Sequence, residues 1–261
     1  MRNLCVAVLG ALFALSVPAA EAAVKTKAVQ YKQGDTVLQG TLAWDDAAKG
    51  KRPGVLVVHE WWGHNEHARA QARRFAQAGY VAFALDMYGK GKVATHPKDA
   101  GAMAAEATKD PAVVTARFDA ALAQLKADPR VDPERIAAVG YCMGGSIALA
   151  MALHGADLDA VSTFHAGLKD VSMPKEKTEV KARLLVNNGE ADPMVPPDVV
   201  KAFEQQMAER GVKAEVVQYP GAKHGFTNPN AAKAKMPALA YDAQADKKSF
   251  ARTKAFFKEV F

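Results

Sequence analysis

One turn decides the fold: Gly140-Tyr141-Cys142-Met143-Gly144-Gly145. It follows segment 135–140, whose apolar residues predict a buried strand, and it leads into segment 142–154, whose small and apolar residues predict a helix. A strand, a G-x-nucleophile-x-G turn and a helix in this order are typical of a nucleophile elbow, in which a strained turn lifts the reactive side chain above the sheet. The turn therefore predicts that Cys142 is a nucleophile.

Strand and helix segments alternate on both sides of this turn. The expected strands are 36–44, 54–59, 80–85, 135–140, 159–164, 183–188 and 214–219, and the expected helices are 65–78, 113–127, 142–154, 197–210 and 245–261. Runs such as Val55-Leu56-Val57-Val58 are apolar throughout, as parallel strands covered on both faces are. The sequence therefore predicts an α/β fold with a mostly parallel central sheet and helices on both faces.

Two long stretches are expected to be irregular, 86–110 and 228–245. In a parallel α/β fold the ligand site lies at the carboxyl ends of the strands. Segment 86–110 follows the end of an expected strand, so it is a candidate cover for such a site.

The N-terminus has the pattern of a signal peptide. Met1-Arg2-Asn3 precedes an apolar run over 4–17, and an Ala-x-Ala site ends at Ala22. The apolar run is too short to span a bilayer as a helix. We expect a signal peptide over 1–22 and a single α/β domain over 23–261, in a protein that is exported to the periplasm or secreted and has no membrane association after cleavage.

Composition narrows the class of partner. Hydrophobic residues make up 49% of the chain, which is enough for a sizeable core, and the formal net charge is +6. The basic residues form no dense block of the kind that binds nucleic acid, so we expect no nucleic-acid partner. A modest positive charge still permits weak attraction of an anionic small-molecule substrate. No pattern in the sequence sets an oligomeric state.

Cysteine usage points to Cys142 independently of its turn. Cys5 lies in the expected signal peptide, so Cys142 is the single thiol of residues 23–261. A lone thiol cannot form an internal disulfide and is a liability in an oxidising compartment, which favours a functional role. The alternative is a buried cysteine that behaves as a small hydrophobic residue.

An acid and a histidine follow two later strands. Asp192 comes shortly after segment 183–188, and His224 comes shortly after segment 214–219. The chain order nucleophile, acid, histidine is that of α/β-hydrolases. Each residue taken alone is commonly a turn or packing residue, but together they predict a Cys142–His224–Asp192 triad, with His224 as base and Asp192 as its orienting acceptor. An ordinary histidine base, with a pKa of about 6.5, predicts loss of activity in mild acid.

Three motifs resemble those of the dienelactone hydrolase family. They are the turn at 140–145, the Asp192 turn with Val195-Pro196, and Gly-Ala-Lys-His-Gly-Phe at 221–226. The resemblance covers roughly residues 53–260 and implies an α/β-hydrolase fold without a cofactor or metal. It also implies hydrolysis of carboxylic esters or lactones through an acyl-enzyme.

The resemblance also implies a role for Glu60, in the segment His59-Glu60-Trp61-Trp62-Gly63. This carboxylate would lie near Cys142 and take its proton when substrate arrives, while His224 and Asp192 handle later proton transfer. The alternative for Glu60 is a cap on the helix expected to begin at residue 65.

The oxyanion of an ester intermediate needs N–H groups aimed at it, and their usual positions assign the backbones of Met143 and Trp61. In the resembled family, cationic side chains hold a substrate carboxylate. Lys90 stands at one such position, but Asn228 stands where an arginine is expected, which argues against the dienelactone itself as substrate. Two aromatic residues are expected to line the pocket or to pack beside it: Tyr88 and Trp62.

Other functional classes remain to be weighed. His59, His64 and His67 suggest zinc, but their spacing is not that of two histidines at i and i+4 on one helix. A thiol redox or sensor protein would need a resolving thiol from a partner. An inactive ligand-binding protein with the same fold is the third alternative, and the intact triad argues against it.

Overall fold

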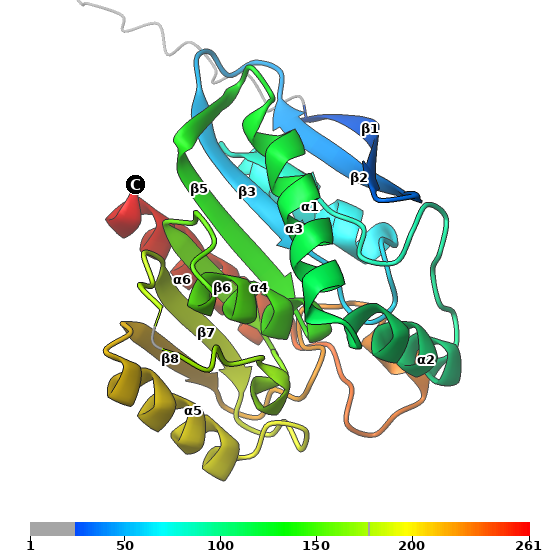
Figure 1. Ribbon diagram of the computed structural model, residues 1–261. Coiled ribbons are helices and arrows are strands. Elements are labelled where there is room, and N and C mark those ends of the chain that lie inside the picture. Colours follow the sequence, from blue (N-terminus) through cyan, green and yellow to red (C-terminus); the bar gives the residue numbers. More distant parts are fainter. Residues whose placement is uncertain (1–23, 177) are drawn as a thin grey trace, which may run out of the picture.

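The computed structural model describes residues 24–176 and 178–261, and one eight-stranded sheet runs through them (Figure 1). The strands are β1 Val24–Gln33, β2 Thr36–Asp45, β3 Arg52–Val58, β4 Val81–Ala84, β5 Val131–Tyr141, β6 Ala160–Phe164, β7 Arg183–Gly189 and β8 Ala214–Tyr219. The α-helices are α1 Glu66–Gln77, α2 Pro97–Thr108, α3 Pro111–Lys126, α4 Met143–Leu153, α5 Pro197–Arg210 and α6 Ala243–Val260, and two short 3-10 helices are η1 Leu168–Asp170 and η2 Ala231–Ala234.

The strand order is β1-β2-β4-β3-β5-β6-β7-β8. β1 and β2 pair antiparallel, as do β2 and β4, and every later pair is parallel. The mostly parallel sheet predicted from the sequence is thus confirmed. Because β5, β7 and β8 run in the same direction, the residues that follow them meet at one edge of the sheet.

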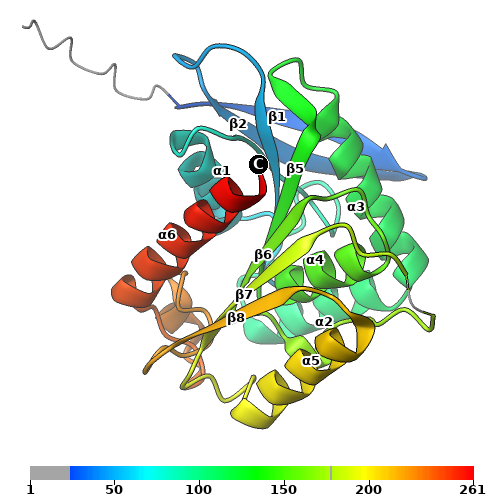
Figure 2. The same ribbon diagram turned by 90° about the vertical axis from the view of Figure 1, so that its left-hand side faces the viewer.

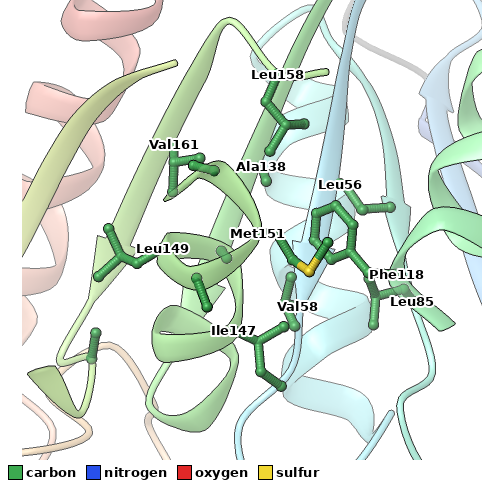
Figure 3. Packing of buried hydrophobic residues seen from close by; sticks show 14 of the residues in the cluster. Leu56, Val58, Leu85, Phe118, Ala138, Ile147, Leu149, Met151, Leu158 and Val161 are labelled. Carbon is green, nitrogen blue, oxygen red and sulfur yellow. The ribbon is translucent and has the colours of Figure 1, made fainter. Parts of the chain in front are cut away.

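Helices cover both faces of the sheet, as predicted. α1 and α6 lie on one face, and α3, α4 and α5 lie on the other (Figure 2). The apolar run of β3 is divided between them by the alternation of a strand. Val55 and Val57 pack with Phe75 of α1, whereas Leu56 and Val58 belong to the cluster that holds the side chains of α3 and α4 (Figure 3).

Two elements were not predicted. β1 is an edge strand in which Tyr31 alone is fully buried, so it lacks the apolar pattern that marks an inner strand. α2 lies inside the stretch 86–110, where the sequence predicted irregular structure, and that prediction was wrong. It begins at Pro97, a residue favoured at the first helical position, but it buries no more than Ala100 and Ala107, so no apolar stripe announces it.

The second stretch expected to be irregular, 228–245, contains η2 and the start of α6. The expected signal peptide lies outside the described residues. Within the residues that the structure describes, no helix combines the length and apolarity needed to cross a membrane.

Candidate active site

Cys142 occupies a strained turn between β5 and α4. Its φ is +52° and its ψ is −121°, a conformation that non-glycine residues rarely adopt. The turn is held by hydrogen bonds from the Cys142 N–H to the Phe164 carbonyl (3.1 Å) and from the Gly145 N–H to the Cys142 carbonyl (2.9 Å). Strain of this kind costs about 1–3 kcal/mol and persists where the surroundings impose it. The half-buried thiol is therefore fixed at the start of α4.

The glycines beside Cys142 are required by close backbone approach. A Cβ on Gly140 would lie 2.2 Å from the Gly144 carbonyl oxygen. A Cβ on Gly144 would lie 2.4 Å from the Val58 carbonyl oxygen, at the end of β3. Side chains at either position would push the turn away from the sheet, so the Gly-x-Cys-x-Gly pattern follows from packing.

The structure brings Asp192 and His224 to Cys142. His224 Nε2 lies 3.1 Å from Cys142 Sγ, and His224 Nδ1 lies 2.8 Å from Asp192 Oδ2. The loops after β7 and β8 are joined, because the Ala191 N–H donates to the Ala222 carbonyl (3.0 Å). Sulfur, imidazole and carboxylate thus form one hydrogen-bonded chain in the order predicted from the sequence.

The electrostatics of this chain favour a charged nucleophile. Burial lowers the pKa of His224, but the charge of Cys142 and hydrogen bonds to Asp192 and Cys142 outweigh it and raise the pKa to about 10. The direction of this shift favours the protonated imidazole beside the sulfur. An imidazolium and a helix N-terminus both stabilise an adjacent thiolate.

The two positions assigned to the oxyanion hole have free donors. Met143 is the first residue of α4, and Trp61 lies in the turn after β3; within the described residues neither backbone N–H donates a hydrogen bond. Tyr88 braces both positions, because its hydroxyl donates to the Trp61 carbonyl (2.8 Å) and lies 3.5 Å from Met143 Sδ. Tyr88 is thus a buried packing residue that holds the loop.

Glu60 is buried, and its carboxylate accepts a hydrogen bond from Asn228 Nδ2 at 2.7 Å. The side chain of Asn65 caps α1 by accepting from the Ala68 N–H, so the alternative in which Glu60 caps this helix is wrong. In this arrangement the group within hydrogen-bond distance of the sulfur is His224 rather than Glu60.

The remaining predicted contacts lie further from the chemistry. Lys90 is exposed, and its backbone N–H donates to the Val37 carbonyl (2.9 Å). Trp62 is half-buried and makes an edge contact with the Trp61 ring at 5.0 Å. A cavity of about 430 Å³ beside α2 is lined by Tyr88, and one of about 470 Å³ lies between α3 and α4; Cys142 lines neither.

The three histidines behind the zinc alternative serve the structure separately. His59 Nδ1 lies 2.6 Å from the Glu60 carbonyl, and its Nε2 accepts from the Met87 N–H. Burial lowers the pKa of His59 and lowers that of His64 to about 4. His67 packs edge-on against Tyr141. Across the described ranges, no three His, Cys, Asp or Glu side chains are arranged to hold a metal ion.

His165 is a site residue that the sequence did not reveal. It is fully buried after β6, with φ at +42°, and its ring lies edge-on to that of His224 at 5.1 Å. Its Nε2 lies 2.9 Å from the hydroxyl of Thr227, on the same loop as His224. Burial keeps its pKa well below the ordinary value, so an uncharged ring packs against His224.

The sequence of this chain was compared with those of known protein families. The sequence model of the dienelactone hydrolase family matches residues 38–261. The chain belongs to the dienelactone hydrolase family. Its class of activity is accordingly the hydrolysis of carboxylic esters or lactones.

Three individual proteins are similar to this dienelactone hydrolase family member over most of its length. It is 31% identical to Protein usf of Aquifex pyrophilus, with 88% of this chain and 97% of the relative covered. The solved structure named m3DLH is 37% identical, with a TM-score of 0.86 and coverage of 92% and 99%. A dienelactone hydrolase-like promiscuous phosphotriesterase from metagenomic libraries is 35% identical, with a TM-score of 0.84 and coverage of 91% and 99%.

Proposed function

We propose that this protein hydrolyses carboxylic esters or lactones through a covalent acyl-enzyme on Cys142, with His224 and Asp192 completing the triad. The observation that carries the proposal is the unbroken hydrogen-bonded chain from Cys142 Sγ through His224 to Asp192. A thiol, a base and an orienting carboxylate in this arrangement are the parts of nucleophilic catalysis.

The reaction has two halves. The Cys142 thiolate attacks the ester carbonyl, and the tetrahedral oxyanion accepts hydrogen bonds from the N–H groups of Met143 and Trp61. His224 then donates its proton to the leaving alkoxide, which departs as an alcohol and leaves a thioester on Cys142. In the second half, His224 takes a proton from water as the water attacks the thioester, and the acid leaves while Cys142 returns to thiolate.

The resting contact of 3.1 Å between Cys142 Sγ and His224 Nε2 supports His224 as the acceptor of the sulfur's proton. Glu60 is the alternative acceptor, and in the resting arrangement its Oε2 accepts a hydrogen bond from Asn228. The variant Glu60→Gln separates the two routes, because full thiol reactivity in this variant means that His224 is sufficient.

The test is ester hydrolysis by the purified protein without residues 1–22. We expect p-nitrophenol release from a short-chain p-nitrophenyl ester, and a loss of at least about 10³-fold in Cys142→Ala, since removal of a triad nucleophile costs several orders of magnitude. Equal rates for the two proteins would reject Cys142 as the nucleophile. No hydrolysis by either would leave a thiol sensor or a ligand-binding protein as the interpretation.

A second candidate activity is phosphotriester hydrolysis. It is favoured by the 35% identical solved structure that is named a promiscuous phosphotriesterase. A neutral phosphotriester presents an electrophilic phosphorus with a good leaving group to the same sulfur. Release of p-nitrophenol from paraoxon, and its loss in Cys142→Ala, is the matching test; silence toward paraoxon with intact esterase activity removes this candidate alone.

A further inference from the structure

Glu60 and Asn228 form a buried pair on the two loops that carry Trp61 and His224. Glu60 directly precedes Trp61, whose N–H is assigned to the oxyanion, and Asn228 follows His224 on a tight loop closed by its own N–H to the Gly225 carbonyl (2.9 Å). Both side chains are 5% exposed and meet at 2.7 Å. The pair therefore belongs to the wall of the site, and no role in the reaction steps above uses it.

Both polar atoms of the Asn228 side chain are engaged by the protein. Its Nδ2 donates to Glu60 Oε2, and its Oδ1 accepts from the Asn230 backbone N–H at 2.9 Å. An amide also carries no charge, so it leaves the charge of the Glu60 carboxylate without compensation. A buried carboxylate of this kind raises the cost of bringing a second anion close to it.

The titratable and cationic groups around the pair leave Glu60 without a cationic partner, and Arg69 is paired with Glu66 and the His64 carbonyl. His59 and His165 are buried with pKa values lowered by burial, and the pKa of His64 is lowered to about 4. His224 is engaged by Asp192 and Cys142, which lie within hydrogen-bond distance of its two ring nitrogens. Lys90 is exposed at the surface, and among the described residues no lysine or arginine pairs with Glu60.

We infer that the Glu60–Asn228 pair selects uncharged acyl groups and rejects substrates that carry a carboxylate next to the scissile ester. This inference rests on the proposed ester hydrolysis and adds its substrate class. The wall of the site presents a carboxylate held by a neutral amide, so a neutral acyl chain enters without an electrostatic penalty and an anionic one does not.

The test compares two esters with the same leaving group and similar acyl length, p-nitrophenyl valerate and mono-p-nitrophenyl glutarate. We expect kcat/KM to favour the neutral valerate by at least about tenfold, the effect of one uncompensated charge at close range. In Glu60→Gln, which is nearly isosteric, the preference should fall at least about threefold. Asn228→Arg, which pairs the carboxylate, should shift the preference in the same direction.

Asn230→Arg is the matched control, because it adds the same charge two residues further along at an exposed position whose backbone N–H is retained. It should leave the preference unchanged. Equal kcat/KM for the two esters in the unmodified protein overturns the inference while the proposed function stands. An unchanged preference in folded Glu60→Gln also overturns it, whatever the stability of Asn228→Arg. Hydrolysis of neither ester rejects the proposed function, and the inference falls with it.

Discussion

At the scale of single residues, the contact between Cys142 and His224 determines how the site responds to pH. The pKa of His224 is raised to about 10, above its ordinary value, so its proton is held below that pH and lost as the pH rises through it. The sequence, which offered an ordinary histidine base, predicted loss of activity in mild acid. The raised pKa applies to the acylation half, in which the imidazolium protonates the leaving group. In the acyl-enzyme the sulfur carries no charge and His224 acts as a base, so the loss of activity in mild acid stays a prediction.

The rate at which iodoacetamide alkylates Cys142 measures directly how the ionisation of the thiol depends on pH. An ordinary cysteine, with a pKa of about 8.5, reacts about tenfold faster for each pH unit gained below that value. We expect the rate for Cys142 to change by less than about threefold from pH 6 to pH 9, and esterase activity to fall above about pH 10. Free cysteine in the same buffers is the control. An alkylation rate that climbs with a midpoint near pH 8.5 is incompatible with the ion pair.

His165 should act as a positioning residue for His224. Asparagine tolerates a positive φ, so His165→Asn keeps the backbone while it removes the ring and the contact with Thr227. We expect kcat to fall about tenfold with KM nearly unchanged, since the alignment of His224 is lost rather than substrate binding. Thr227→Val removes the hydrogen bond alone and should cost about 1 kcal/mol of unfolding free energy. A wild-type kcat in His165→Asn would reduce this residue to packing.

The sequence singled out Cys142, Asp192 and His224 because each follows a strand and the three stand in a known order. It did not reveal His165, because a histidine after an apolar strand is indistinguishable from a core residue until its neighbours are known. It also could not show that Asn228 binds Glu60, since 168 positions separate them in the chain. Pairings of this kind depend on how the loops fold over the sheet edge.

At the scale of the elements, the junction of β5 and α4 depends on glycines that permit close backbone contact. Gly144→Ala would place a Cβ 2.4 Å from the Val58 carbonyl oxygen, so α4 must move away from β3. We expect a loss of about 1–3 kcal/mol in unfolding free energy, measured in urea, together with a fall in esterase activity.

Gly101→Ala is the matched substitution in α2, where the nearest atom to the new Cβ is in the Trp61 ring at 4.0 Å. There we expect a gain of about 0.5–1 kcal/mol, because alanine restricts the unfolded chain and favours a helix. Equal unfolding free energies for the two variants would mean that the elbow tolerates a side chain at Gly144.

Elements with a strong apolar pattern were predictable, and those without one were not. α5 lies at Pro197–Arg210 and β8 at Ala214–Tyr219, as the sequence predicted, because their apolar residues recur with the period of a helix or strand. β1 depends instead on pairing with β2, and α2 depends on packing against α3. Their local sequences carry too little buried apolar area to predict them.

At the scale of the whole molecule, a hydrophobic cluster on each face of the sheet accounts for the apolar strands. The described part of the chain begins at Val24 with β1. We propose that the protein is exported and that cleavage after Ala22 leaves β1 complete. Expression of the full chain in a Gram-negative host should give a periplasmic protein whose first residue is Ala23, read by intact mass. Cytoplasmic protein that still begins at Met1 would contradict export, and cleavage inside β1 would contradict the proposed site.

The most direct test of the proposed chemistry is to trap the covalent intermediate. The protein is mixed with excess p-nitrophenyl ester, quenched in acid during turnover, digested and mapped by mass spectrometry. We expect the acyl group on the peptide that contains Cys142 and none in Cys142→Ala. In His224→Asn we expect more of the acyl group on Cys142, since hydrolysis of the thioester should slow more than its formation. Turnover without any acyl group on Cys142, or the group on another residue, would show that Cys142 is not the nucleophile.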